Sequence, residues 1–306
     1  MYHKFFGLRE SPFNVSPDPR YLYTTPHTEE ALACLTYGIQ NRKGFVLLTG
    51  EVGTGKTTLI NKLLEWLRRE GMPTAFIFNS RLNVLQFFDF MMADFGIPCD
   101  SRLKSQVLMR LNHWLLERYR AGETPVLIVD EAQNLSPQVL EEIRLLTNLE
   151  TYTEKLLQIV LSGQQELELK LRQPALRQLR QRITLRAKTH ALTLEETSGY
   201  ITGRLKIAGS DGQTLFTPSA IEAIHKYARG IPRVTNLLCE HALINAFADQ
   251  VNPVGPELVE EVAQEFELHL IEPTAPAAYA PGEDNLRLVE ALRGLATLMD
   301  RLRRTE

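Results

Sequence analysis

Residues 45–58 read Phe-Val-Leu-Leu-Thr-Gly-Glu-Val-Gly-Thr-Gly-Lys-Thr-Thr, and this stretch decides the fold. The apolar run Phe45–Thr49 has the length of a buried strand, and Gly50–Thr57 fits the pattern Gly-x-x-x-x-Gly-Lys-Thr ahead of a helical pattern. Glycines let several backbone N–H groups turn toward one phosphate, and a helix N-terminus adds its positive dipole end. The stretch therefore predicts a nucleotide-binding loop; a purely structural glycine turn is the alternative.

The residues of this loop have separate expected roles toward ATP or ADP. Lys56 is expected to reach the β- and γ-phosphates, and the Thr57 hydroxyl is expected to ligate Mg²⁺. The remaining residues that we expect to contact the nucleotide are Gly50, Glu51, Val52, Gly53, Thr54, Gly55 and Thr58.

Two adjacent carboxylates follow the apolar run Val126–Val129. Asp130, at the end of this strand, is expected to hold Mg²⁺ through its hydration shell, and Glu131 is expected to activate the attacking water as a general base. The alternative is an ordinary acidic helix start. Ser136-Pro137 is the better helix start, however, because it offers an N-cap followed by proline at the first helical position.

A third set of polar residues follows the run Leu156–Leu161. We expect Gln164 to lie beside the γ-phosphate, because an amide both donates to a phosphate oxygen and accepts from a water. Ser162 is the second choice, and a polar turn without a chemical role is the alternative.

Residues 170–190 contain seven basic residues and no acid. They fit a solvated helix face, a nucleic-acid patch, or arginines that reach a neighbouring copy's γ-phosphate. We predict the third role, a finger that contributes ~10³ to 10⁵ in rate, for Arg182, with Arg180 as the alternative, because both precede the expected last strand, Ile183–Leu185. Arg233, in the tract Gly230–Arg233 that opens a later helix, is expected to contact a bound phosphate as well.

The order of apolar runs predicts the architecture. Short apolar runs alternate with helical patterns up to about residue 185, which indicates a parallel sheet buried on both faces in an α/β domain, and only helical patterns follow Leu194. We expect the aromatic, proline-rich arm to lie on the sheet domain. The predicted parts are the arm with the first helix (1–40), a nucleotide-binding α/β domain (41–192), a helical lid (193–270), a Pro/Ala linker (271–284) and an amphipathic C-terminal helix (285–306).

Composition excludes several classes of protein. Lys and Arg number 34 against 37 Asp and Glu, a net charge of −3, so no global field favours nucleic acid. Cys34, Cys99 and Cys239 form no Cys-x-x-Cys pair, which argues against a zinc site or a disulfide framework. Since no secretory signal or membrane-spanning run is visible, we expect a cytoplasmic protein, with peripheral attachment to the inner membrane left open.

Taken together, these motifs resemble those of AAA+ ATPases, in the branch that includes replication initiators and Holliday-junction motors. The loop at Gly50 and the Asp130-Glu131 pair correspond to the Walker A and Walker B motifs. Further tracts resemble the general secretion pathway protein A family over about residues 1–268. They are Phe5-Phe6-Gly7-Leu8, Pro12-Phe13, Pro17-Asp18-Pro19-Arg20, Gly44–Thr58 and Asp130–Leu135.

The resemblance implies an ATPase that oligomerises in the cytoplasm and drives or switches the assembly of a secretion, pilus or polysaccharide export system. The final helix, with its heptad of Leu288, Leu292, Leu295, Met299 and Leu302, is then a candidate contact for an envelope component. The resemblance also implies that Asn79 holds Glu131 off when no partner is bound. Several family members continue into a membrane span and a peptidoglycan-binding domain; residues 1–306 show neither, so we do not expect peptidoglycan binding.

Two other functions fit the same motifs. A DNA-binding AAA+ ATPase of the transposition-targeting or initiator type shares the core fold, and its DNA retention would depend steeply on salt. A nucleotide-gated scaffold with negligible turnover is the third. We favour the export ATPase because the total charge is close to neutral.

Overall fold

The computed structural model describes residues 2–14, 18–78, 81–98, 101, 103–212 and 214–268. These residues form two compact units. The unit that we call the helical unit contains the residues up to Thr25, the segment Val52–Thr58 and the residues from His190 onward. The unit that we call the sheet unit contains Pro26–Glu51 and Leu59–Thr189.

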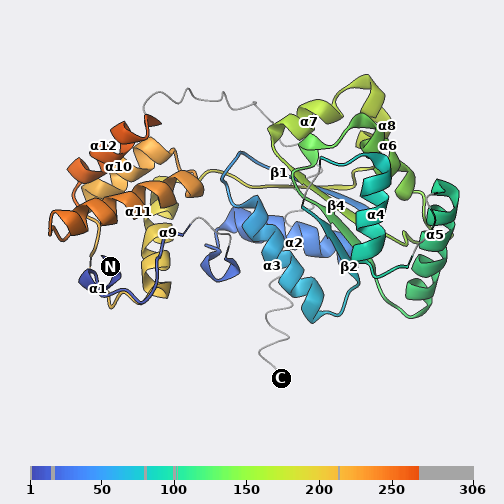
Figure 1. Cartoon of the computed structure of the whole chain (residues 1–306), viewed down its shortest axis with the longest axis horizontal. Helices are drawn as coiled ribbons and strands as arrows, with labels where there is room; N and C mark the ends of the chain where they lie inside the picture. The colour runs from blue at the N-terminus through green and yellow to red at the C-terminus, as the bar shows by residue number, and fades with distance from the viewer. Residues whose placement is uncertain are drawn as a thin grey trace. The chain divides into compact units, whose positions relative to one another are not determined.

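The sheet unit is built on five parallel strands, as the apolar runs predict. They are β1 (Phe45–Thr49), β2 (Thr74–Ile77), β3 (Val126–Val129), β4 (Gln158–Gly163) and β5 (Leu185–Lys188). Their order is β2-β3-β4-β1-β5, and each neighbouring pair is parallel (Figure 1). The register sets Thr49 beside Gly163 and Val129 beside Leu161, so the carboxyl ends of β1, β3 and β4 share one edge of the sheet.

Helices cover both faces of this sheet (Figure 1). They are α2 (Pro26–Gln40), α3 (Lys56–Arg69), α4 (Val84–Asp94), α5 (Lys104–Arg120), α6 (Pro137–Leu146), α7 (Gln165–Leu171) and α8 (Arg177–Arg182). Because side chains alternate along a strand, Phe45 and Leu47 enter the core shared with α4, α5 and α6, whereas Val46 faces Gly38 of α2. The predicted α/β class is confirmed.

The helical unit contains α1 (Tyr2–Phe5), α9 (Leu194–Ile207), α10 (Pro218–Ala228), α11 (Pro232–Ala248) and α12 (Pro256–Glu265). A capping box between Thr193 and Glu196 starts α9, and proline stands at the start of each of the three later helices. Within the described residues, none of the helices is both long and apolar enough to cross a bilayer.

The N-terminal arm packs in the helical unit, so the expectation that it lies on the sheet domain is wrong. Phe6 and Phe13 are each 1 % exposed and belong to the core formed by α9 to α12. The buried Arg204 of α9 fixes the arm in place, because its guanidinium donates to the Pro12 carbonyl at 2.6 Å and lies 4.4 Å from the centre of the Tyr21 ring. Aromatic rings need a covering surface, but the sequence does not show which surface supplies it.

Several boundaries differ by a few residues from the predicted ones. β5 begins at Leu185 rather than Ile183, and it alternates buried and exposed side chains because it lies at the edge of the sheet. β4 extends through Ser162 and Gly163. The predicted linker (271–284) and C-terminal helix (285–306) lie outside the described residues.

Candidate active site

The predicted phosphate loop joins β1 to α3, which begins at Lys56. Gly53 and Gly55 have φ values of +81° and +93°, a backbone region that side chains with a Cβ rarely adopt. The strand, loop and helix are therefore arranged as the sequence pattern requires. Lys56 and Thr54 are buried, at 5 % and 8 % exposure.

Part of this loop, Val52–Thr58, packs with α11 inside the helical unit. The backbone N–H of Arg233 donates to the Gly53 carbonyl at 3.2 Å. A Cβ on residue 53 would lie 2.8 Å from Cβ of Arg233 and 2.9 Å from Cγ2 of Ile231. Gly53 is therefore required for close packing as well as for its backbone angles. The loop thus meets the start of α11, but the role of the exposed Arg233 side chain toward a phosphate stays a prediction.

Asp130 is a buried carboxylate at the carboxyl end of β3, with 4 % exposure. Its Oδ1 accepts a 2.7 Å hydrogen bond from the Ser162 hydroxyl and a 2.9 Å bond from the backbone N–H of Glu131. Ser162, the second choice for a γ-phosphate contact, therefore supports Asp130, and its role toward a phosphate stays a prediction. Two donors on one oxygen hold the carboxylate in a fixed orientation.

Glu131 adopts a left-handed backbone conformation, with φ 51° and ψ 36°, at the start of the short 3₁₀ helix η2 (Ala132–Asn134). A residue other than glycine in this region is strained, and such strain gathers at functional sites. The Glu131 carboxylate accepts hydrogen bonds from the side-chain amides of Gln133 and Gln164. The amides of Gln133 and Gln164 therefore both hold the side chain of Glu131.

Gln164 lies next to Glu131, as its position at the end of the next strand predicts. It precedes α7, and its Nε2 donates to Oε2 of Glu131 at 3.1 Å. Gln133 is a contact that we did not predict. The sequence gives one indication of this contact: Gln133 stands two positions after Glu131, close enough for its side chain to reach the carboxylate within one turn.

A second polar group joins the ends of β1 and β5 to α7. Glu168 accepts a 2.6 Å hydrogen bond from the Thr49 hydroxyl and forms a 3.3 Å ion pair with Lys188. Burial raises the pKa of Glu168, but the Thr49 hydrogen bond and the Lys188 charge outweigh burial, so the net pKa lies below its ordinary value. Glu168 is therefore an anion at neutral pH that fixes the residue just before the phosphate loop.

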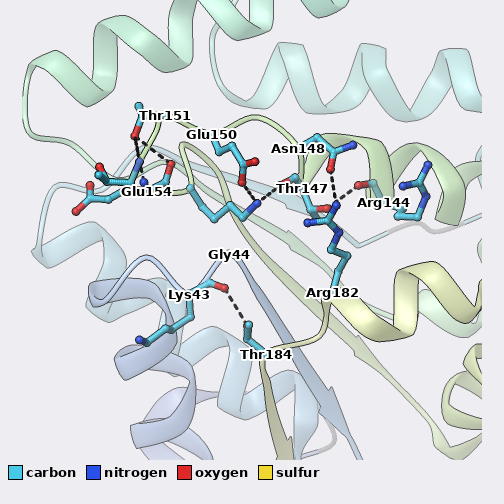
Figure 2. A network of polar contacts seen from close by, with 12 residues as sticks. Lys43, Gly44, Arg144, Thr147, Asn148, Glu150, Thr151, Glu154, Arg182 and Thr184 are labelled. Atoms are coloured by element: carbon cyan, nitrogen blue, oxygen red, sulfur yellow. Dashed lines mark hydrogen bonds and ion pairs between the residues drawn. The ribbon is translucent and has the colours of Figure 1, made fainter.

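Arg182 lies at the opposite edge of the sheet, because α8 ends just before β5 begins and the strands are parallel. Figure 2 shows its guanidinium directed at Asn148, whose Oδ1 accepts from Arg182 Nη2 at 3.0 Å. Close by, the Thr184 hydroxyl donates to the Lys43 carbonyl at 2.9 Å. Arg182 is exposed and thus available to a second molecule, as a finger acting in trans requires.

Two of the seven basic residues between Lys170 and His190 bind other residues of the sheet unit. Lys188 pairs with Glu168, and the ammonium of Lys170 donates to the carbonyls of Gln133 and Leu135. Burial lowers the pKa of Lys170. The other five, Arg172, Arg177, Arg180, Arg182 and Arg186, are exposed, although Arg182 also donates to Asn148. A continuous nucleic-acid patch is therefore smaller than the sequence indicates.

Asn79 and the metal ligands are the remaining predicted features of the site. Asn79 lies outside the described residues, so its role toward Glu131 stays a prediction. No group of three or more His, Cys, Asp or Glu side chains that could hold a metal by themselves occurs in the described parts of the chain. Thr57 and Asp130, the two expected Mg²⁺ ligands, belong to different units, so their shared role toward Mg²⁺ stays a prediction.

Comparisons with known proteins agree with this geometry. Residues 39–171 match the family model described as an AAA domain. General secretion pathway protein A of Aeromonas hydrophila is 49% identical over 249 residues, which is 81% of this chain and 45% of the relative. The chain therefore contains an AAA domain, over residues 39–171. The predicted resemblance to general secretion pathway protein A is confirmed, and the chain spans less than half of that relative's length.

Known structures show the same AAA+ fold at low sequence identity. Cdc6p from Pyrobaculum aerophilum has 19% identity and a TM-score of 0.62, with 79% of this chain and 68% of that chain covered. The ORC2 protein of Aeropyrum pernix, as ADPNP and ADP complexes, has 19% identity and a TM-score of 0.57, with 79% and 70% covered. These likenesses establish the fold alone. The AAA domain match itself implies that this part of the chain binds a nucleotide.

Proposed function

We propose that this AAA+ protein binds and hydrolyses ATP with Mg²⁺, oligomerises, and drives or switches the assembly of a secretion, pilus or polysaccharide export system. The observation that carries the hydrolysis is the acidic turn. A buried Asp130 is held by Ser162, and next to it a strained Glu131 is oriented by two amides. The export role draws on the 49% identity to general secretion pathway protein A.

The proposed chemistry divides among the chain's own residues. The backbone N–H groups of residues 53–55 and the Lys56 ammonium bind the phosphates, while Thr57 and Asp130 hold Mg²⁺. When bound, Mg²⁺ neutralises charge on the β- and γ-phosphates. Glu131 accepts a proton from the attacking water.

Charge that develops on the γ-phosphate is met by three further donors. Gln164 donates from the same turn, Arg233 from the start of α11, and Arg182 from a neighbouring copy. Two observations support Arg182 in this role: its side chain is exposed, and the hydrogen bond to Asn148 holds the guanidinium in a defined position at the surface. Export components are the proposed partners, and the protein is proposed to work in the cytoplasm, at or near the inner membrane.

Hydrolysis by the full chain tests the first part. Lys56→Ala is expected to lose binding of a fluorescent ATP analogue, whereas Glu131→Gln is expected to bind the analogue and to hydrolyse ATP at least ~100-fold more slowly. Glu131→Gln hydrolysing at the wild-type rate would refute the role of the carboxylate. Duplex DNA retention that falls steeply between 50 and 200 mM salt, on the order expected for several phosphate contacts, would favour the DNA-binding alternative.

A mixing experiment tests action in trans. Arg182→Ala and Glu131→Gln are each expected to be inactive alone, but their mixture is expected to regain activity. The reason is that an intact Glu131 site then meets an intact Arg182 from its neighbour. Arg177→Ala, an exposed arginine on the same helix, is the control and should hydrolyse ATP at the wild-type rate. A mixture no more active than its components would contradict a finger at Arg182.

A further inference from the structure

The side chain of Glu131 is held by two glutamine amides that come from different strands' ends. Nε2 of Gln133 and Nε2 of Gln164 both donate to the same oxygen of Glu131, Oε2. Gln133 lies in η2 after β3, and Gln164 lies after β4. Two donors that converge on one oxygen define the direction of the carboxylate far more narrowly than one donor does.

The hydrogen bonds determine which way the Gln133 amide faces. Oε1 of Gln133 accepts from the backbone N–H of Gln164 at 3.2 Å. A backbone N–H is always a donor, so the opposite atom must be the carbonyl oxygen of the side chain. The NH₂ group of Gln133 is thereby directed at Glu131. Gln133 thus links the end of β4 to the carboxylate.

The surrounding residues are shaped to keep Gln133 in place. Gly163 allows the close approach, because a Cβ there would lie 2.9 Å from Oε1 of Gln133 and 2.6 Å from Cδ2 of Leu167. The Lys170 ammonium donates to the backbone carbonyl of Gln133 at 3.1 Å and to that of Leu135. Side chain and backbone of Gln133 are therefore both anchored by the segment that follows β4.

We propose that Gln133 is a positioning residue, which sets the direction of the Glu131 carboxylate and supports its left-handed backbone. This rests on the proposed role of Glu131 as the base. Gln133 does not touch the substrate in this proposal; it acts through Glu131. Displacing a catalytic base by about 1 Å can lower the rate by up to ~10²-fold.

The test uses Gln133→Met in the full chain, because methionine keeps the length of the side chain and removes both polar atoms. We expect kcat for ATP to fall about tenfold, as the loss of a hydrogen bond to a charged group predicts. The KM for ATP and the Kd of a non-hydrolysable fluorescent ATP analogue should stay within about twofold, because Gln133 makes no contact with the phosphate loop's own residues in this proposal. Gln138→Met, an exposed glutamine five positions away, is the control and should match the wild type.

A second measurement needs neither ATP nor activity. Hydrogen–deuterium exchange of the ligand-free protein should be faster in peptides covering residues 131–135 of Gln133→Met. Without the Gln133 amide, the turn opens more often, which exposes the backbone N–H groups of Asn134 and Leu135. In the wild type these donate to the carbonyls of Glu131, at 3.0 Å, and Ala132, at 3.1 Å. Gln133→Asn keeps the amide but shortens the side chain, so it is expected to lower kcat as well, and it serves if the methionine variant does not fold.

The outcomes separate this proposal from the proposed function. An unchanged or raised kcat in Gln133→Met, or a KM that rises while kcat is constant, would overturn the positioning role. If the wild-type protein itself does not hydrolyse ATP, the proposed function fails, and the exchange measurement still decides whether Gln133 holds the turn. Exchange at the wild-type rate in Gln133→Met would overturn the proposal on its own.

Discussion

The hydrogen bond between Ser162 and Asp130 gives a quantitative prediction about the acidic turn. The Ser162 hydroxyl donates to Oδ1 of Asp130 at 2.7 Å, and the two residues are 0% and 4% exposed. A hydrogen bond to a charged acceptor contributes about 1.5–3 kcal/mol. Since Ser162→Ala removes a single atom and leaves little empty volume, we expect the variant to lose about 2 kcal/mol of unfolding free energy. In a domain of this size that loss lowers Tm by roughly 4–8 °C.

A double-mutant cycle isolates the bond from other effects of the substitution. Ser162→Ala should cost about 2 kcal/mol in the wild-type background and less than about 0.5 kcal/mol in Asp130→Ala, because the acceptor is then already gone. Urea unfolding without nucleotide and with chelator avoids a contribution from bound ligands. Ser105→Ala, on the exposed face of α5, is the control and should stay within about 0.5 kcal/mol of the wild type. Equal costs in both backgrounds would refute the assigned role of Ser162.

Two further predictions concern the other polar groups. Arg204→Lys should expose the N-terminal arm to trypsin at Arg9 and Arg20, because lysine cannot reproduce the guanidinium's bonds to Pro12 and its stacking on Tyr21; an arm as resistant as in the wild type would contradict this. Glu168→Gln should lower stability at pH 7, and the difference from the wild type should shrink as the pH falls below the ordinary pKa of a glutamate. The pKa of Glu168 is lowered in the folded protein, so its contribution is complete above the ordinary value of about 4.3 and disappears as the pH falls through the lowered value. Urea midpoints measured from pH 7 to pH 3 check this, and a constant difference between the variants would count against it.

The central strands could be predicted because burial on both faces leaves a signal in the sequence itself. Val126–Val129 is wholly apolar, and the strand is found at those residues. The expected strand Ile183–Leu185 overlaps the edge strand β5 only at Leu185, because the apolar pattern stops there and the exposed Arg186 follows within β5. Helix starts were predictable where a cap is visible, as at Ser136 before α6.

The site was predictable at the level of individual motifs and less so at the level of contacts. Asp130, Glu131 and Gln164 follow strands whose ends share an edge, so their proximity follows from the topology. The contacts of Gln133 depend on the left-handed backbone of Glu131. Glutamate rarely adopts this conformation, so the sequence does not predict it. Likewise, the partner of the N-terminal arm is decided by Arg204, which is distant in sequence.

The membership of the arm in the helical unit has a consequence for synthesis on the ribosome. Phe6 and Phe13 are synthesised before the sheet unit, and the helices that bury them are synthesised after it. The aromatic rings of the arm therefore stay without their native partners while the sheet unit is synthesised. Folding of the sheet unit ahead of the helical unit does not bury them. An expression fragment that begins at Pro26 would leave a hole in the helical core, so any attempt to produce α9 to α12 alone has to supply residues 1–25 as a second piece.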